Sequence, residues 1–356
     1  MKILHIINGL KNGGAEKTLL KLVNADSVNQ HIVFVLSRKD DFFSSYFKDE
    51  ALVFFAEGSL FNKLLHLRSV AHKYKPDILQ GWMYHSNLFC FLFNLTSFKK
   101  YNIIWNIRNN SLNGLKIFTK IIVLLSGLIS FLFRYKCIYP SFTAKKYHEF
   151  YLFRNSFVIP NGFDFSKTNI DKKLLSPVLK LLMVARWDIQ KDHNSLFSAL
   201  ALINDFPWIL TLVGEGISSD NFELKSMLLK HNLIDKVVLL GVTNNIDSVY
   251  SENDILLLTS RSESFPNVIL EAVSNGLLVI SSNVGDVELI LSNNKWLFNS
   301  KDIIVLKTLI IRARELWLNK EDWENEVGVF KERIINKYKI VNMVDEYNLI
   351  WNSTTT

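Results

Sequence analysis

A chain of 356 residues, 49% apolar and 21% charged, is long enough for two domains and too apolar to be disordered. Its two cysteines, Cys90 and Cys137, lie in apolar runs without CxxC spacing, which argues against a disulfide scaffold or zinc site and fits a reducing compartment. No signal-peptide core follows Met1, and the longest apolar run, residues 121–133, is shorter than the roughly 20 residues that span a bilayer. We therefore expect a cytoplasmic protein, free or peripheral to the membrane.

The net charge of +7 is unevenly distributed along the chain. Residues 1–170 contain 22 basic and 10 acidic side chains, whereas residues 171–356 contain 19 basic and 24 acidic ones. A basic half joined to an acidic half predicts that the first half meets an anionic partner, such as a nucleic acid, a membrane surface or a phosphorylated acceptor. A solvated basic surface is the alternative that needs no partner.

Short apolar strands alternate with helical patterns in the first half. Strands are predicted at residues 3–7, 31–36, 52–55, 78–80, 103–107 and 137–139, with helices between them, for example at 15–24, 61–73 and 141–150. Because the strands are apolar on both faces, the pattern predicts an α/β fold with a doubly wound parallel sheet covered by helices on each side.

The same alternation restarts after a break at Pro160-Asn161-Gly162. Strands are predicted at residues 181–185, 209–213, 237–240, 255–258 and 278–281, with a helix from about Asp192. The end of the chain, residues 302–351, is helical and charged, and its expected packing anchors are Trp317, Trp323, Tyr338, Tyr347 and Trp351. In doubly wound sheets ligands bind beyond the carboxyl ends of the strands, so we expect the site residues in loops that follow strands.

The first candidate segment is Asn12-Gly13-Gly14-Ala15-Glu16, directly after the first strand. Paired glycines let a backbone approach a ligand, and the start of the following helix favours an anion. A tight strand–helix turn would explain the same residues without a ligand. The segment is not GxGxxG, and no acidic residue ends the second strand, so a dinucleotide-dependent dehydrogenase is poorly supported.

The second segment, residues 184–191, presents Arg186 and Lys191 five residues apart after a predicted strand. Arg186 can bind a phosphate in a bidentate manner, and Lys191 offers a point charge. Together they could neutralise a diphosphate leaving group. The alternative is that both are solvated surface cations.

The third segment, residues 259–272, is the most informative one. A buried strand, residues 255–258, delivers Glu263 into a loop, and Pro266 suits the first turn of the helix that follows. A capping glutamate and a surface glutamate, Glu263 and Glu271, would also explain the segment.

The start of this helix favours a ligand with ribose, diphosphate and sugar in a row. The amides near Asn267 and Val268 could bind an anion. Glu271 follows Asn267 by four residues and shares its helix face, where a carboxylate can accept hydrogen bonds from sugar hydroxyls. Glu263, before the helix, reaches the group on the other side of the phosphates.

These residues resemble the glycosyltransferase family 4 group of retaining enzymes with the GT-B fold, of the polysaccharide-assembly type, over nearly the whole chain. The matching residues are Gly13-Gly14-Ala15-Glu16, Pro160-Asn161-Gly162-Phe163-Asp164, Arg186 with Lys191, Val213-Gly214-Glu215-Gly216, Glu263 with Glu271, and residues 282–288. The resemblance implies two facing Rossmann-like domains. Residues 1–165 would bind the acceptor, residues 166–337 would bind the nucleotide-sugar, and a C-terminal helix, residues 338–356, would cross back to the first domain.

The resemblance also implies roles for individual residues. Glu271 matches the ribose-binding glutamate, Glu263 matches the glutamate that contacts the donor sugar, and Arg186 with Lys191 matches the diphosphate-binding pair. The whole set assigned to the donor is Gly13, Gly14, Arg186, Lys191, Glu263, Phe265, Pro266, Asn267, Val268 and Glu271. Such sites in the family need no metal and no cofactor besides the nucleotide-sugar, and no Asp-x-Asp occurs here in a suitable loop.

The chain departs from the family pattern at two places. Ser264 follows Glu263 where the family often has glycine, which adds a hydroxymethyl group beside the donor. Many members carry a histidine after the fourth or fifth strand, but residues 105–110 contain none. Residues 82–87, one strand earlier, resemble a stretch of polysaccharide-assembly members, so we predict that His85 or Arg108 faces the donor sugar, with a core or helix-start role as the alternative for His85.

The function implied is that of a retaining hexosyltransferase that moves a sugar from a UDP-sugar to a hydroxyl of a glycan or lipid-linked acceptor in surface-polysaccharide biosynthesis. The basic first half suits such an acceptor at the anionic inner membrane face rather than a nucleic acid. Residues 114–135, basic at the ends and apolar in the middle, would rest on the membrane or form a buried core helix. Two other functions stay open: a sugar-nucleotide epimerase or hydrolase of similar fold, and a non-catalytic partner subunit.

Overall fold

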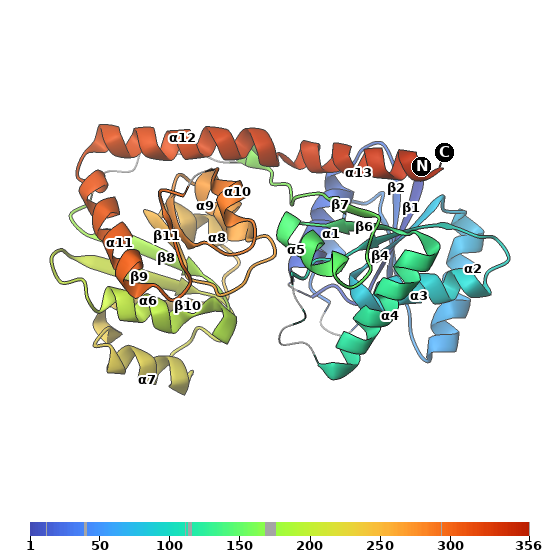
Figure 1. Cartoon of the computed structure of the whole chain (residues 1–356), viewed down its shortest axis with the longest axis horizontal. Coiled ribbons are helices and arrows are strands. Elements are labelled where there is room, and N and C mark those ends of the chain that lie inside the picture. The colour runs from blue at the N-terminus through green and yellow to red at the C-terminus, as the bar shows by residue number, and fades with distance from the viewer. Residues whose placement is uncertain are drawn as a thin grey trace. The chain divides into compact units, whose positions relative to one another are not determined.

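The computed structural model describes residues 1–11, 13–38, 41–110, 112, 116–167, 176–292 and 294–355. These residues form two compact units (Figure 1). Unit 1 comprises Met1–Gly162 and Lys339–Thr356, and unit 2 comprises Phe163–Tyr338.

Unit 1 is built on a parallel sheet that, in the described part of the chain, has seven strands in the order β3-β2-β1-β4-β5-β6-β7. Each strand predicted for the first half is present to within two residues at either end. The short last strand was not predicted, because three half-buried residues carry no periodic signal. The strands are β1 (Lys2–Ile7), β2 (Gln30–Val35), β3 (Leu52–Phe55), β4 (Ile78–Trp82), β5 (Asn102–Asn106), β6 (Lys136–Tyr139) and β7 (Ser156–Val158).

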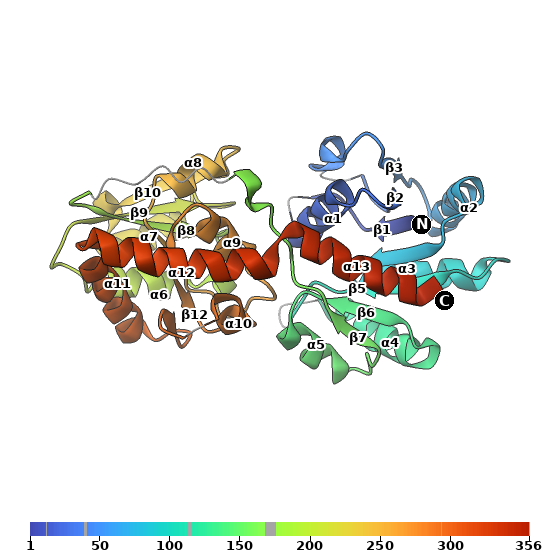
Figure 2. The same cartoon turned by 90° about the horizontal axis from the view of Figure 1, so that it is seen from above.

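Helices cover both faces of this sheet, as predicted (Figure 2). Their bounds are α1 (Gly14–Ala25), α2 (Leu60–Tyr74), α3 (Met83–Thr96), α4 (Ile117–Phe133), α5 (Phe142–Glu149) and α13 (Ile340–Thr355), with a 3-10 turn η1 (Ser44–Tyr46). Buried side chains of α1 and α13 pack on one face, and those of α2, α3, α4 and α5 pack on the other. The last helix of the chain therefore packs on the first unit, where its anchors Tyr347 and Trp351 are fully buried.

Buried polar groups help to hold α13 on the sheet. Trp82 Nε1 lies 3.2 Å from His5 Nδ1, His5 Nε2 lies 2.9 Å from His31 Nδ1, and His31 Nε2 lies 3.1 Å from Asp26 Oδ2. Because an indole N–H can only donate, His5 accepts at Nδ1 and donates from Nε2 to His31, which in turn donates to Asp26. Trp351 of α13 packs against both imidazole rings, so these hydrogen bonds set the surface on which α13 rests.

The sequence allowed residues 114–135 to be a buried core helix, but α4, which forms there, is not buried on all sides. Residues 114 and 115 lie outside the described residues, and α4 begins at Ile117. Its buried side consists of Ile122, Val123, Ser126, Gly127 and Ser130, whereas large apolar side chains on the opposite side are exposed. α4 is therefore a core helix on one side only, and a helix buried on all sides is excluded.

Unit 2 repeats the architecture with a parallel sheet of six strands among the described residues, in the order β10-β9-β8-β11-β12-β13. The strands are β8 (Leu179–Val184), β9 (Trp208–Val213), β10 (Val237–Gly241), β11 (Ile255–Leu258), β12 (Leu278–Ser282) and β13 (Leu297–Phe298). The helices are α6 (His193–Leu200), α7 (Phe222–Lys230), α8 (Ile246–Ser251), α9 (Asn267–Ser274), α10 (Val287–Leu291), α11 (Ile303–Trp317) and α12 (Lys320–Tyr338), with 3-10 turns η2 (Phe165–Lys167), η3 (Ile189–Lys191) and η4 (Ile234–Lys236). Trp317, Trp323 and Tyr338 are buried, as predicted.

Both units are doubly wound α/β domains, which confirms the predicted fold class. Among the described residues, no helix is both long and apolar enough to cross a membrane.

Candidate functional site

In unit 2 the loops after β8 and β11 lie side by side, because these strands are neighbours in the sheet. Two hydrogen bonds tie the loops together. The Arg261 N–H donates to the Gln190 carbonyl oxygen (2.7 Å), and Thr259 Oγ1 donates to the Lys191 carbonyl oxygen (2.9 Å). The second and third candidate segments therefore form one surface at the carboxyl edge of the sheet.

Lys191 and Glu263 form an ion pair on this surface. Lys191 Nζ lies 2.6 Å from Glu263 Oε1, and the two side chains are only 20% and 12% exposed. Ser260 Oγ also donates to Glu263 Oε1 (2.6 Å). The loop after β12 closes on the same residue, because Gly285, at φ +60°, packs on the Glu263 carbonyl oxygen and leaves no room for a Cβ. Lys191 and Glu263 are thus held in place before any ligand arrives.

Arg186 is placed differently from Lys191. Its guanidinium binds Asp188 through Nε and Nη2, each 3.0 Å from Oδ2, and its side chain is 56% exposed. Burial would raise the pKa of Asp188, but the Gln190 N–H and the Arg186 guanidinium outweigh it and lower that pKa. Arg186 is therefore an exposed cation that an incoming anion would have to draw away from Asp188.

The helix α9 starts at the same edge. Its N-cap residue is Pro266, one position earlier than the first helical turn in which the sequence placed this proline. Because proline has no side-chain acceptor, it cannot cap the first-turn N–H groups, to which Asn267 and Val268 belong. Phe265 is buried and packs on Tyr338 (ring centroids 5.6 Å apart), so its side chain belongs to the core. Only its backbone is left to contact a ligand.

Glu271 is oriented by a buried phenol. Tyr250, which is fully buried, donates its hydroxyl to Glu271 Oε2 (2.8 Å). Burial and the negative charge of Glu271 raise the pKa of Tyr250 far above its usual value, so the phenol stays a donor. Sequence reasoning missed Tyr250, because it precedes Glu271 by 21 residues in a helix that shows no motif.

Ser264, the departure from the family pattern, has a buried Oγ without a hydrogen-bond partner among the described residues. It directly follows Glu263. A buried hydroxyl that makes no hydrogen bond costs free energy, so a ligand group that reached Ser264 would gain by binding it.

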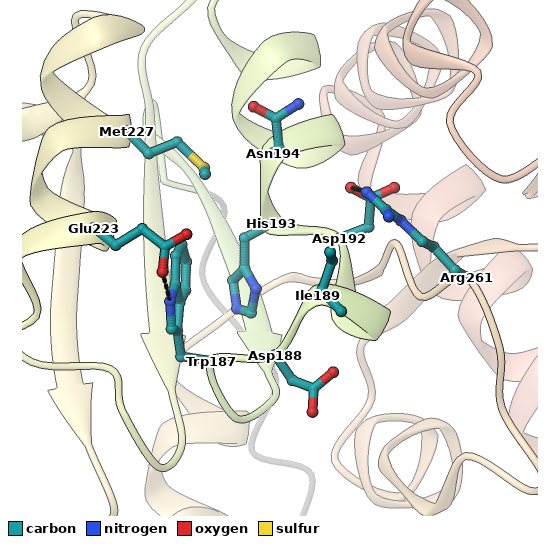
Figure 3. Close-up of a pocket in the computed structure, with 9 residues that line it drawn as sticks. All are labelled: Trp187, Asp188, Ile189, Asp192, His193, Asn194, Glu223, Met227 and Arg261. Atoms are coloured by element: carbon teal, nitrogen blue, oxygen red, sulfur yellow. Dashed lines mark hydrogen bonds and ion pairs between the residues drawn. The ribbon is translucent and has the colours of Figure 1, made fainter. Parts of the chain in front are cut away.

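A pocket of about 460 Å³ is lined by the loop after β8, the start of α6, α7 and Arg261 of the loop after β11 (Figure 3). Trp187 and His193 form its centre, with ring centroids 4.8 Å apart, and Trp187 Nε1 donates to Glu223 Oε2 (3.1 Å). Burial and the charge of Lys191 lower the pKa of His193 to about 4, so this imidazole is neutral at pH 7. Sequence analysis did not predict this pocket, although Trp187 and Asp188 belong to the second candidate segment and Arg261 belongs to the third.

The glycines of Val213-Gly214-Glu215-Gly216 have a packing role. Gly214, at φ +147°, lies against the Ala185 carbonyl oxygen, and Gly216, at φ +76°, lies against Trp187. A side chain at either position would push the loops after β8 and β9 apart.

In unit 1 the predicted residues lie at the carboxyl ends of β1, β4 and β5. Gly13 is the N-cap of α1, and Asn12 lies outside the described residues. A Cβ on Gly14 would meet no described atom within 4 Å, so packing within the described chain does not demand this glycine. The Glu16 carboxyl lies against Gly13, and burial raises its pKa, so an anion at this helix start would meet a nearby carboxyl group.

Arg108, after β5, is a buried guanidinium that forms no ion pair with a carboxylate among the described residues. It donates to Asn161 Oδ1 (2.7 Å) and to the Tyr347 hydroxyl of α13, and it lies over the Trp82 ring. Its Nε has no partner in the described part of the chain. Arg108 thus joins α13 to the sheet and keeps hydrogen-bonding capacity for an anion.

His85 is exposed in the first turn of α3, which excludes a core role. The helix begins directly after β4 with Met83 at φ +69°, a strained conformation for a residue that is not glycine. Such strain is frequent at functional sites, and no sequence signal indicates it. No group of three or more potential metal-ligating side chains occurs among the described residues.

Residues 166–327 match the family model of glycosyl transferases group 1. An Escherichia coli UDP-Gal:alpha-D-GlcNAc-diphosphoundecaprenol alpha-1,3-galactosyltransferase is 28% identical over 214 residues, 53% of this chain and 52% of that protein. A Campylobacter jejuni GalNAc-alpha-(1->4)-GalNAc-alpha-(1->3)-diNAcBac-PP-undecaprenol alpha-1,4-N-acetyl-D-galactosaminyltransferase is 24% identical over 368 residues, 98% of this chain and 97% of that protein. The chain spans about half the length of the first curated relatives it matches.

Among solved structures, that of Anabaena HepE in complex with UDP and glucose is similar to this chain with a TM-score of 0.82 at 18% identity, covering 99% of this chain and all of HepE. At that identity the likeness concerns the fold, two Rossmann-like domains of the GT-B class. The match to the glycosyl transferases group 1 family is thus confined to residues 166–327, within unit 2.

Proposed function

We propose that this protein transfers a sugar from a UDP-sugar to a hydroxyl of a glycan carried on a polyprenyl diphosphate lipid, with retention of the anomeric configuration. The family match and two relatives named for undecaprenol-linked acceptors support the reaction class. The galactosyltransferase among them is named for UDP-Gal, which supports a uridine nucleotide. Retention follows from the resemblance to glycosyltransferase family 4.

The observation that carries the proposal is the Lys191–Glu263 pair, 2.6 Å apart, at the carboxyl ends of β8 and β11. When the glycosidic bond of the donor breaks, negative charge grows on the diphosphate. A partly buried ammonium group and the first-turn amides of α9 would stabilise that charge without rearrangement. Arg186 would leave Asp188 and add a bidentate contact.

Two glutamates would bind the two ends of the donor. Glu271, held at Oε2 by Tyr250, would accept hydrogen bonds from the ribose hydroxyls through Oε1. Glu263 and the unpartnered Ser264 hydroxyl would bind the transferred sugar. This order matches the row of ribose, diphosphate and sugar.

In this scheme the protein's cations, not a divalent metal, stabilise the leaving group, and no cofactor besides the nucleotide-sugar takes part. EDTA should therefore leave the activity unchanged. A cytoplasmic location with contact to the anionic inner face of the membrane belongs to the same proposal, because the polyprenyl acceptor is anchored there.

The test is a matrix of UDP- and GDP-sugars against synthetic polyprenyl-diphosphate sugars, with products identified by mass spectrometry and NMR. The proposal expects an acceptor extended by one sugar in the retained configuration, with release of UDP. Free sugar or an epimerised nucleotide-sugar formed without acceptor would instead assign a hydrolase or epimerase. A folded protein that binds no nucleotide would assign a non-catalytic partner.

A further inference from the structure

The helix α4 carries its large apolar side chains on the outside of unit 1. Six of them follow one another at positions i, i+3, i+4, i+7, i+10 and i+11, which places them on one face of the helix. Each is between 45% and 64% exposed. The residues are Ile121, Leu124, Leu125, Leu128, Phe131 and Leu132, and we call this surface the α4 face.

The opposite side of α4 explains why the helix does not turn this face inward. Gly127 packs so closely on the Tyr151 carbonyl oxygen that no Cβ fits between them, and Ser130 Oγ lies 3.2 Å from Cys137 Sγ of β6. Small residues thus bring α4 close to the sheet, next to α3 (Figure 1). Ile122 and Val123 fill the rest of the contact with the core, and the six residues of the α4 face are left outside.

The sequence on both sides of α4 carries charge of one sign. The chain has no acidic residue between Asp77 and Glu149, but it has nine lysines and arginines in that interval. Exposed Lys116 and Arg134 flank α4 at its two ends. An apolar stripe roughly 17 Å long on a helix with basic ends has the character of a helix that lies in the interface of an anionic bilayer.

We propose that the α4 face docks on an anionic lipid bilayer, with its apolar side chains in the acyl boundary and Lys116 and Arg134 at the headgroups. The alternative partner that could bury the α4 face is a second copy of the chain. Symmetric pairing through this face would bring basic ends near each other, whereas anionic headgroups neutralise them. The inference deepens the proposed function, and its link to a polyprenyl acceptor rests on that function.

The experiment uses the full chain and vesicles of phosphatidylcholine with or without phosphatidylglycerol, at low and high salt. We expect flotation with the anionic vesicles, weakened by salt. Leu124→Ser and Leu128→Ser should each lower the partition coefficient by about 10-fold. The matched controls are two single variants, Leu65→Ser on α2 and Leu229→Ser on α7, which replace leucines of similar exposure. Each control variant should float like the wild type.

A fluorescent label reports insertion directly. Cys90 and Cys137 are fully buried, so an environment-sensitive dye will react selectively with Leu128→Cys. Its emission should shift to the blue with anionic vesicles, and that of labelled Leu65→Cys should not. An unshifted Leu128→Cys label, or flotation unaffected by the serine substitutions, would overturn the proposal.

Light scattering without vesicles distinguishes docking on a bilayer from pairing with a second copy of the chain. A wild-type dimer that Leu124→Ser converts to monomers, together with failure to float, would show that the α4 face is a subunit interface. The proposed function is tested apart from this, because the serine variants should keep wild-type turnover of an acceptor with a short, unanchored lipid. If the wild type floated with anionic vesicles but transferred no sugar, the proposed reaction would be refuted and the docking surface would still be supported.

Discussion

Replacing Lys191 by alanine should separate the two effects of its ion pair, on stability and on turnover. In the folded protein the substitution leaves Glu263, 12% exposed, without its cation. The carboxylate keeps the hydrogen bond from Ser260 and some contact with water, so the loss of stability should be near the lower end of about 1–3 kcal/mol. The variant should therefore fold, which makes its kinetics interpretable.

The larger effect should appear in turnover. If Lys191 stabilises the departing diphosphate, its loss removes a preorganised group worth about 2.7–4 kcal/mol, or 10²- to 10³-fold in rate. Because that charge develops only in the transition state, kcat should fall more than the affinity for the donor. Steady-state kinetics with the donor found in the substrate matrix measures both quantities, and urea unfolding measures the stability.

A second ion pair of the same length provides the control. Lys295 Nζ lies 2.6 Å from Glu326, before the short strand β13 and away from the carboxyl edge of the sheet. Lys295→Ala should leave kcat within a few fold of the wild type. The leaving-group role would be refuted by a folded Lys191→Ala variant with near-wild-type kcat, or by an equal loss in Lys295→Ala.

Three further predictions concern other parts of the molecule. Glu271→Ala should weaken UDP binding by about 10- to 150-fold in a calorimetric titration, because charge-assisted hydrogen bonds to ribose are lost, and unchanged affinity would remove the ribose assignment. In the folded state the pKa of His193 is about 4, below the value of roughly 6.5 in an unfolded chain. Between these pH values the folded protein binds fewer protons than the unfolded chain. The free energy of unfolding should therefore fall as pH drops from 6.5 towards 4, by about 3 kcal/mol at most. Urea unfolding across this range should show a shallower slope for His193→Gln, and an equal slope would contradict the assignment. Arg108→Lys should speed amide hydrogen exchange in α13, because a point charge cannot bind Asn161 and Tyr347 together as the guanidinium does, and wild-type protection would argue against this clamp.

The sequence predicted the strands of both sheets well, since each is a short run apolar on both faces and such runs are typical of buried parallel strands. Ile255–Leu258 and Leu52–Phe55 coincide with β11 and β3. It did not predict β7, and it gave no bounds for α3. Three half-buried residues have no pattern, and α3 starts within a motif at a strained methionine, where no cap residue marks the helix start.

Some residues of the candidate site could likewise be predicted from the sequence, and others could not. The residue types and spacing of the loops after β8 and β11 predicted an anion-binding edge, because turn and helix-start chemistry is local, and that assignment stays a prediction. The Lys191–Glu263 pair joins residues 72 positions apart, and Tyr250 reaches Glu271 from another helix. Such pairs depend on strand order, which no local pattern encodes.

The orientation of α4 shows the same limit most clearly. Its sequence is apolar around most of the helix, so periodicity alone could not tell a core helix from one that lies on a surface. The choice depended on the close contact between Gly127 and Tyr151, which lie on different elements. Local sequence determined that α4 is a helix, and only tertiary packing, which decides which face meets the sheet, left its leucines outside.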